Sequence, residues 1–372
     1  MVYEEITDSA RLPEIVASCR EKSAIALDTE FARTNTYYPI VGLVQIYDGE
    51  NCYLIDPLAV EDLSPLADLL SDDSVTKVLH ACSEDVEVFC DALGVVPQPI
   101  FDTQIAAALL GVGFSVSYQN LVKHYMDILI PKEETRSDWL QRPLTASQLE
   151  YAALDVIHLL EVYELQQVEL ADLDRAGWVT DECAKLAQDI PTQIDPEDFY
   201  LKVKNLWRLD QSQLYVLKQL CAWRERAARE KNMPRNRIVD EKALFQIAAL
   251  SLSDKKAFRD KAEMTSRQLR FHADELETLL AEWRSAPVDD YPDLIEKKNS
   301  PINNQLLRSL KKVVAECAEK LNVAPEMLAK RRHLEQLIRS ENSAGEFRLP
   351  SALGGWRQSV IGEPLLKEVA EK

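Results

Sequence analysis

Two carboxylates interrupt a stretch of otherwise apolar sequence near the start of the chain. The stretch "SAIALDTEFARTN" covers residues 23–35 and places Asp28 and Glu30 on either side of Thr29. Successive side chains of a β-strand alternate between its two faces, so these acids point the same way. Neighbouring carboxylates on a buried strand repel each other unless a cation lies between them or one of them stays protonated. A solvated edge strand with two surface acids is the alternative, and this segment alone leaves it open.

Two further segments place acids beside apolar sequence. Asp85 follows the strand-like "TKVLHA" in the first turn of a helix that Ser83 could cap, where the helix dipole favours acids in any case. Tyr151 and Asp155 are four residues apart in "LEYAALDVIHLL", so they share one face of a helix. A purely structural Tyr–Asp pair is the alternative for that face.

The four acids form the ligand set that a two-metal phosphoryl-transfer site requires. Mg²⁺ and Mn²⁺ prefer carboxylate oxygens and water. Two such ions, held about 4 Å apart, can activate a water and stabilise the leaving oxygen of an in-line displacement. They would also remove the repulsion between the paired acids. The sequence therefore predicts two divalent ions bound by Asp28, Glu30, Asp85 and Asp155.

Composition and charge define the setting of this chemistry. The chain has 372 residues, enough for two or three domains, and its 46% hydrophobic and 28% charged residues are ordinary for a globular protein. The net charge of −19 is uneven, because residues 1–200 hold 11 basic and 37 acidic residues, against 32 and 25 in the remainder. This asymmetry predicts catalysis in the acidic part and polyanion binding in the basic part. Acidic composition that only aids solubility is the alternative.

The sequence gives no sign of a membrane or an oxidising compartment. No apolar run approaches the ~18 residues of a membrane helix, and the first residues lack the pattern of a signal peptide. The seven cysteines form no C-x-x-C pair, which indicates free thiols. We therefore expect a cytoplasmic protein with no membrane association.

Hydrophobic periodicity predicts an α/β domain over residues 1–187. Strand-like segments span 24–31, 41–47, 52–56 and 76–81, and the first three follow one another as closely as antiparallel strands do. Helical patterns lie near 62–71, 84–93, 102–111 and 116–125, with one long pattern over 145–170. This order predicts a mixed sheet covered by helices.

The remaining sequence predicts helical domains. The Pro- and acid-rich "QDIPTQIDPEDFY" indicates a linker over residues 188–206. The stretch that follows is helical throughout, and a second break, "SAPVDDYPD", divides it into domains over 207–288 and 289–372. The predicted fold class is therefore α/β followed by all-α.

The acidic motifs, taken in order, resemble those of the DEDD exonuclease superfamily, which has an RNase H-like fold. Glu150 stands where the histidine branch would have its histidine, so the chain resembles the tyrosine branch. Blocks such as "LDTEF", "HACSEDVEVF" and "RSDWLQRPLTASQLEYAALDV" are similar to the ribonuclease D family, and the helical regions resemble two HRDC domains, the second more divergent. One departure is Cys82, where a glycine is expected.

The resemblance implies a 3′–5′ exoribonuclease that trims structured RNAs, notably tRNA precursors, and releases nucleoside 5′-monophosphates. Asp28, Glu30 and Asp155 would hold the ion that activates water. Asp28 would also bridge to the second ion, and Asp85 would act mainly through water. Tyr151 would position the attacking water, since a phenol with a pKa near ~10 is a poor base. A DNA 3′–5′ exonuclease and a non-catalytic nucleic-acid-binding protein are the alternatives.

Several residues are candidates for RNA contact. Packing is the alternative for Phe31, Tyr118, Gln119 and Lys123, and a solvated helix face is the alternative for the basic stretch. In the first domain they are Phe31, Tyr118, Gln119, Lys123, Arg136, Trp139 and Arg142. In the basic stretch 218–239 they are Arg229, Lys231 and Arg235, which we expect to hold RNA phosphates. We interpret Asp102 as a helix N-cap rather than a residue behind the metal ligands, and His80 and His158 as structural. We further expect a monomer whose partner is RNA.

Overall fold

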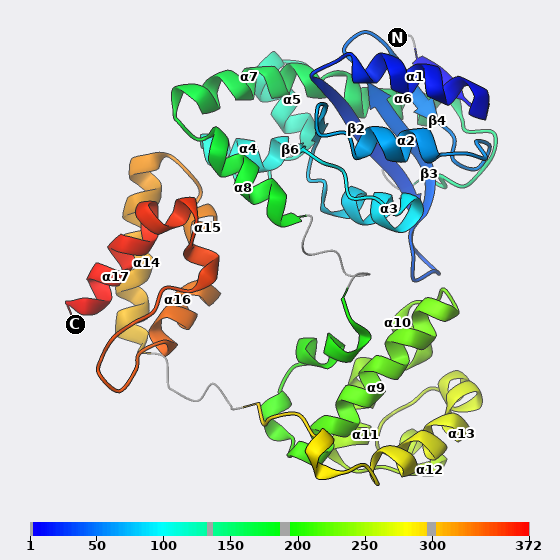
Figure 1. The fold of residues 1–372 in the computed structure, drawn as a ribbon, viewed down its shortest axis with the longest axis vertical. Coiled ribbons are helices and arrows are strands. Elements are labelled where there is room, and N and C mark those ends of the chain that lie inside the picture. Colours follow the sequence, from blue (N-terminus) through cyan, green and yellow to red (C-terminus); the bar gives the residue numbers. More distant parts are fainter. Residues whose placement is uncertain (1–2, 132–136, 187–193, 296–302, 372) are drawn as a thin grey trace. The chain divides into compact units, whose positions relative to one another are not determined.

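The computed structural model describes residues 3–131, 137–186, 194–295 and 303–371 (Figure 1). Its contacts divide the chain into two units. The first unit contains residues 1–32, 41–190 and 300–372, and the second contains 33–40 and 191–299. Among the described residues, no helix is both long and apolar enough to cross a membrane.

A six-stranded mixed sheet forms the centre of the first unit. Its strands are β1 (Tyr3–Ile6), β2 (Ala24–Ala32), β3 (Ile40–Tyr47), β4 (Cys52–Ile55), β5 (Thr76–Leu79) and β6 (Ile100–Asp102). Their order is β1-β4-β3-β2-β5-β6, with β3 and β4 antiparallel and the pairs β1/β4, β2/β5 and β5/β6 parallel. The predicted mixed sheet is confirmed. Since β2 lies between β3 and β5, the solvated edge strand considered for Asp28 and Glu30 is excluded.

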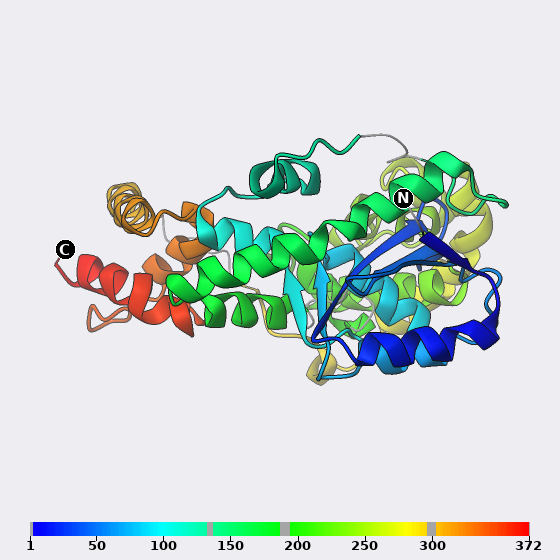
Figure 2. The ribbon, with the colours of Figure 1, turned by 90° about the horizontal axis from the view of Figure 1, so that it is seen from above.

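Helices cover both faces of this sheet. They are α1 (Leu12–Arg20), α2 (Ser64–Leu70), α3 (Ser83–Leu93), α4 (Thr103–Leu110), α5 (Tyr118–Met126), α6 (Ala146–Ile157), α7 (Leu159–Asp172) and α8 (Ala176–Leu186), with a short 3₁₀ helix, η1 (Ser9–Arg11). Ile25 and Leu27 enter a core cluster with α1, α2 and α3, whereas Ala26 enters a second cluster with α4 to α7. Figure 2 shows α1 on one side of the strands and the α6–α7 pair on the other. The alternation of β2 therefore decides which helix each of its side chains meets.

The structure corrects the prediction of one continuous helix over 145–170. The helix stops at Ile157, and His158 (φ −94°, ψ −6°) separates α6 from α7. The hydroxyl of Tyr118 donates to the carbonyl of Leu154 at 3.0 Å and accepts from the backbone N–H of His158. It thus replaces the i to i−4 bond that would join these two residues, and such an insertion breaks a helix.

The second unit is helical. It contains η3 (Pro196–Lys202), η4 (Leu206–Arg208), α9 (Gln211–Glu230), α10 (Arg235–Ile238), α11 (Glu241–Ala249), α12 (Lys255–Asp260), α13 (Ser266–Trp283) and η5 (Val288–Asp290). The described part of the stretch predicted as a linker differs from an open connection, because η3 packs along α9 and buries Phe199. Tyr37, from the segment between β2 and β3, is buried in the same core.

The C-terminal helices build a further core within the first unit. They are α14 (Asn304–Leu321), α15 (Pro325–Leu328), α16 (Arg331–Arg339), η6 (Ser351–Leu353), η7 (Gln358–Gly362) and α17 (Glu363–Ala370). Trp356 stacks on Trp178 of α8 with ring centroids 4.4 Å apart, and Arg357 pairs with Glu182 of the same helix. The predicted all-α fold of this region is confirmed.

Asp102 joins the ends of two elements next to β2. It caps α4 as predicted, because its Oδ1 accepts the N–H of Gln104 at 2.8 Å. The same carboxylate also accepts the N–H groups of Ala81 and Cys82, at 3.1 and 3.0 Å, in the turn before α3. Asp102 is only 2% exposed and Cys82 is fully buried, so the N–H of Cys82 would find no water in place of this carboxylate.

We expect Asp102→Ala to lower the free energy of unfolding by about 3 kcal/mol, since each buried N–H left without a partner costs roughly 1–3 kcal/mol. Urea denaturation followed by circular dichroism measures this change. Asp62→Ala is the matched control: it removes an exposed carboxylate that accepts the N–H of Ser64, and should cost below ~1 kcal/mol. Equal losses in the two variants would contradict a special role for the buried carboxylate.

Candidate active site

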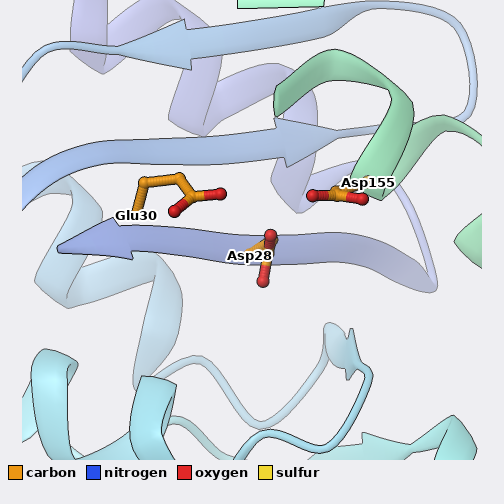
Figure 3. A group of neighbouring side chains, drawn as sticks. All are labelled: Asp28, Glu30 and Asp155. Carbon is orange, nitrogen blue, oxygen red and sulfur yellow. The ribbon is translucent and has the colours of Figure 1, made fainter. Parts of the chain in front are cut away.

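Three of the predicted metal ligands meet beside the sheet. Carboxylate oxygens of Asp28, Glu30 and Asp155 all lie within 4.8 Å of one another. Figure 3 shows Asp28 and Glu30 projecting from β2 while Asp155 reaches toward them from α6. Asp28 and Glu30 follow Ala26 on the β2 face that meets α4 to α7, which is why Asp155 can approach them.

Asp85 approaches Asp28 from the other side of the strand. It lies in the first turn of α3, is 8% exposed, and accepts a hydrogen bond of 2.5 Å from the hydroxyl of Thr29. It is near enough to Asp28 for its charge to raise the pKa of that carboxyl. Sequence reasoning missed this role of Thr29, although the strand alternation that sets it opposite Asp28 was the available signal.

Burial raises the pKa of every acid in the site, and repulsion between site acids adds to this effect for two of them. Burial is the largest cause for each carboxyl. It raises the pKa of Glu30 to about 9, of Asp155 to about 7 and of Asp85 to about 6, and places the pKa of Asp28 well above its usual range. The charges of neighbouring acids add to the shifts of Asp28 and Glu30. Such clustered oxygen donors, destabilised as anions, fit a divalent cation, which would offset both the repulsion and the desolvation.

Tyr151 completes the cluster on α6. Its hydroxyl donates to Asp155, one helical turn away, as the four-residue spacing predicts. Burial and the charge of Asp155 raise the pKa of Tyr151 above its ordinary value, so the phenol stays protonated at neutral pH. It can therefore orient a neighbouring group by hydrogen bonding, but it is a poor base.

A cavity of about 290 Å³ opens onto these groups. Its lining includes Asp28, Asp155 and Tyr151 together with Gln119 and Gln104. Gln104 escaped the sequence analysis, because a glutamine near a helix start carries no distinctive signal. Gln119 lines the cavity, and its contact with RNA stays a prediction.

The other first-domain candidates have different surroundings. Tyr118 also lines the cavity, but it is 7% exposed and its hydroxyl is bound by α6. Phe31 is half-buried on β2, two residues beyond Thr29, and its base contact also stays a prediction. Lys123 is paired with Asp127 at 2.9 Å. Arg136 lies outside the described residues.

His80 has the structural role that we predicted. Its Nδ1 lies 2.9 Å from the hydroxyl of Thr103, and its Nε2 lies 3.0 Å from the carbonyl oxygen of Val116. Both ring nitrogens therefore have partners. His158 occupies the break between α6 and α7.

Trp139 requires a correction. It is only 4% exposed, and its ring packs against Tyr151 with centroids 6.2 Å apart. A buried ring offers no face to an RNA base, so packing against Tyr151 replaces the predicted base contact.

The three basic candidates of the second unit, Arg229, Lys231 and Arg235, have different surroundings. Arg229 and Arg235 each donate to the carboxylate of Glu225, at 3.0 and 2.5 Å, and to the hydroxyl of Tyr37. The Glu225 side chain is only 1% exposed, so these arginines neutralise a buried charge in the structure as it stands. Arg229 and Arg235 remain 22% and 32% exposed, and their contact with RNA phosphates stays a prediction. Lys231 is exposed, and it borders a cavity of about 310 Å³ that Trp223 and Trp283 also line.

Comparison with protein families defines the class of enzyme. Residues 3–170 match the family model described as 3′-5′ exonuclease, residues 213–284 match the HRDC domain, and residues 301–365 match the C-terminal HRDC domain of ribonuclease D. The acids that converge in the structure all lie within the exonuclease match. The fold and site thus define a 3′–5′ exonuclease with helical HRDC domains.

Individual relatives narrow this class. Ribonuclease D of Pseudomonas paraeruginosa is 44% identical over 97% of this chain and 96% of its own, and that of Escherichia coli is 37% identical over 98% of both. The crystal structure of Escherichia coli RNase D, described as an exoribonuclease involved in structured RNA processing, matches 100% of this chain and 99% of its own with a TM-score of 0.92 and 36% identity. The chain belongs to the ribonuclease D family, and it is a hydrolase of the 3′–5′ exoribonuclease type. The predicted family, fold class and enzyme class are confirmed.

We expect Asp28→Asn to raise the melting temperature of the metal-free protein at pH 8, because it removes one of several repelling, desolvated charges. A raised carboxyl pKa stabilises the folded state below the unfolded pKa of about 4, and this stabilisation is lost as pH rises through the folded value. The difference in melting temperature between Asp28→Asn and the wild type should therefore grow between pH 5 and pH 9. Thermal melts in EDTA measure it.

The same melts with Mg²⁺ supply a second comparison. The ion should raise the melting temperature of the wild type by more than that of Asp28→Asn, since it binds the folded ligand set. Asp68→Asn, an exposed acid on α2, is the control and should follow the wild type at every pH. A variant that melts below the wild type at pH 8 and gains equally from Mg²⁺ would refute the repulsive site.

Proposed function

We propose that this exoribonuclease removes nucleotides one at a time from the 3′ ends of structured RNAs, notably tRNA precursors, and releases nucleoside 5′-monophosphates with the aid of two divalent ions, Mg²⁺ or Mn²⁺. The observation that carries the proposal is the convergence of Asp28, Glu30 and Asp155 beside a protonated Tyr151. The description of the Escherichia coli relative as processing structured RNA supports the substrate class.

The four acids divide between two ion positions. Asp28, Glu30 and Asp155 would hold one ion, because their oxygens lie within 4.8 Å of one another. Asp28 would also be a ligand of a second ion on the side of Asp85. Asp85 would bind that ion mainly through water. Thr29 holds the Asp85 carboxylate in place by its hydroxyl. When bound, two such ions lower the pKa of the attacking water and stabilise the leaving 3′ oxygen.

Tyr151 directs the attacking water. Its hydroxyl proton is committed to Asp155, so a lone pair of the phenol oxygen remains free to accept a hydrogen bond from water. That bond would fix the direction in which the oxygen of the water faces the phosphorus. The gain is one of orientation, since the phenol itself does not take the proton.

The cellular compartment and the oligomeric state of the enzyme are also proposals. All seven cysteines are free thiols, which supports a reducing compartment, and we assign the enzyme to the cytoplasm as a monomer. A DNA exonuclease would need the same four acids, so the choice of RNA rests on family membership and on the helical HRDC domains.

An assay with RNA and DNA of equal sequence tests the proposal. We expect the protein with Mg²⁺ or Mn²⁺ to release labelled nucleoside monophosphate from a 3′-labelled tRNA-like hairpin that has a single-stranded 3′ end. Asp155→Asn should lower the rate by several orders of magnitude while the protein stays folded, and EDTA should stop the reaction. Equal rates on DNA would favour the alternative nuclease, and near-wild-type rates for Asp155→Asn would refute the assigned site.

Lys231 gives a separate test of RNA binding by the second unit. Lys231→Glu should weaken binding of a long RNA several-fold, and should reduce the slope of log K against log salt by ~0.7, the value for one phosphate on a single strand. Hydrolysis of a very short oligonucleotide should be unchanged. Lys242→Glu, an exposed lysine of the same unit that pairs with Glu263, is the control. Equal losses on short and long RNA, or the same effect from the control, would exclude a phosphate contact at Lys231.

A further inference from the structure

The segment over residues 137–145 lies between the sheet and α6, and Arg142 is its anchor. We propose that Arg142 is a positioning residue for the reaction: it fixes Trp139 against Tyr151 and thereby sets the direction of the Tyr151 hydroxyl. This inference rests on the proposed role of Tyr151 in orienting the attacking water. It assigns a task to a cation that sequence reasoning counted among the RNA contacts.

All five N–H donors of the Arg142 guanidinium are occupied. Nε and Nη2 donate to the two carboxylate oxygens of Asp56, each at 2.6 Å. The second proton of Nη2 goes to the carbonyl of Gly42 at 2.6 Å. Nη1 donates to the carbonyls of Trp139 and Gln141, at 3.0 and 2.7 Å. A guanidinium has five donors and no more, so none remains for a phosphate.

These bonds join the segment to the sheet. Asp56 directly follows β4, and Gly42 belongs to β3, the neighbour of the metal-binding strand β2. A Cβ at Gly42 would lie 2.5 Å from the carbonyl oxygen of Trp139, so the backbone of the segment rests directly on β3. The close approach explains why glycine is required there.

The other side of the segment is joined to α6. The side-chain oxygen of Gln148 accepts from the side-chain amide of Gln141 at 2.6 Å and from the N–H of Thr145 at 2.9 Å. Its own amide donates to the carbonyl of Asp138 at 3.2 Å. Gln148 lies in the first turn of α6, one turn before Tyr151. The segment is therefore held on both sides.

Trp139 transmits this constraint to the site. It is 4% exposed, and its ring packs against that of Tyr151 at 6.2 Å and an interplanar angle of 40°. The terminal torsion of a tyrosine has a broad energy minimum, so a packed neighbour decides where the ring lies. Displacing a catalytic group by about 1 Å can cost ~100-fold in rate. A shift of Trp139 would therefore change the rate of the chemical step more than it changes RNA binding.

A double-mutant cycle between Arg142 and Tyr151 tests the inference. Lysine at position 142 keeps the charge but supplies neither five donors nor a planar fork. With a short single-stranded RNA and saturating Mg²⁺, we expect Arg142→Lys to lower kcat about tenfold and to change KM less than twofold. Tyr151→Phe should also lower kcat. In the Tyr151→Phe background, Arg142→Lys should change kcat by less than twofold, because its effect acts through the missing hydroxyl.

Two further variants guard against a change in folding alone. Asp56→Asn removes the charge that holds the guanidinium and should repeat the pattern of Arg142→Lys, including its dependence on Tyr151. Arg175→Lys is the matched control, since that buried guanidinium also donates to backbone carbonyls, those of Leu109 and Leu321. It should alter the melting temperature with little effect on kcat.

The outcomes separate the inference from the function on which it rests. Losses in kcat that multiply in the double variant would show that Arg142 acts on the fold, and would overturn the positioning role alone. A wild-type kcat for Tyr151→Phe would overturn both the positioning role and the proposed role of Tyr151. If Arg142→Lys does not fold, the cycle with Asp56→Asn decides in the same way.

Discussion

The structure of the active site depends on the repulsion among carboxylates that the fold removes from water. Asp28 and Glu30 lie on a central strand, and Asp155 is brought within 4.8 Å of both. Isolated anions in such surroundings are costly, and the pKa of Glu30, raised to about 9 by burial and by its neighbours, reflects that cost. The acids that would bind the catalytic ions are therefore also groups whose burial lowers the stability of the first unit.

The two faces of β2 explain how four acids reach this place without being adjacent in sequence. Alternation directs Asp28 and Glu30 toward α6, which supplies Asp155 and Tyr151, and directs Thr29 toward α3, which supplies Asp85. The strand thus separates the cluster of Asp28, Glu30 and Asp155 from the fourth predicted ligand, Asp85. A strand with one residue inserted before Asp28 would exchange these partners completely, since register and facing are coupled.

Sequence reasoning succeeded where local periodicity decides the structure, and it failed where a distant partner decides. The mixed sheet, the shared face of Tyr151 and Asp155, and the cap at Asp102 follow from strand alternation, helical spacing and capping rules. The break at His158 depends on the Tyr118 hydroxyl, 36 residues from Leu154 along the chain, and no local pattern announces it. The burial of Trp139 likewise depends on the approach of its segment to Gly42 of β3.

The roles of Arg229 and Arg235 in the basic stretch also depend on a distant partner, Tyr37. Their neighbour Glu225 offers a comparison with the acids of the active site. The Glu225 side chain is buried too, at only 1% exposed, yet its pKa is lowered, because Arg235, Arg229 and the hydroxyl of Tyr37 oppose the effect of burial. For Glu30 and Asp28, burial and the charges of other acids raise the pKa, and a backbone hydrogen bond at Thr29 opposes this for Asp28. A buried carboxylate with a structural role, such as Glu225, is neutralised by basic side chains of the same protein. Carboxylates left to repel one another are instead ready to accept cations from outside, and this difference distinguishes a binding site for divalent ions from a structural ion cluster of similar composition.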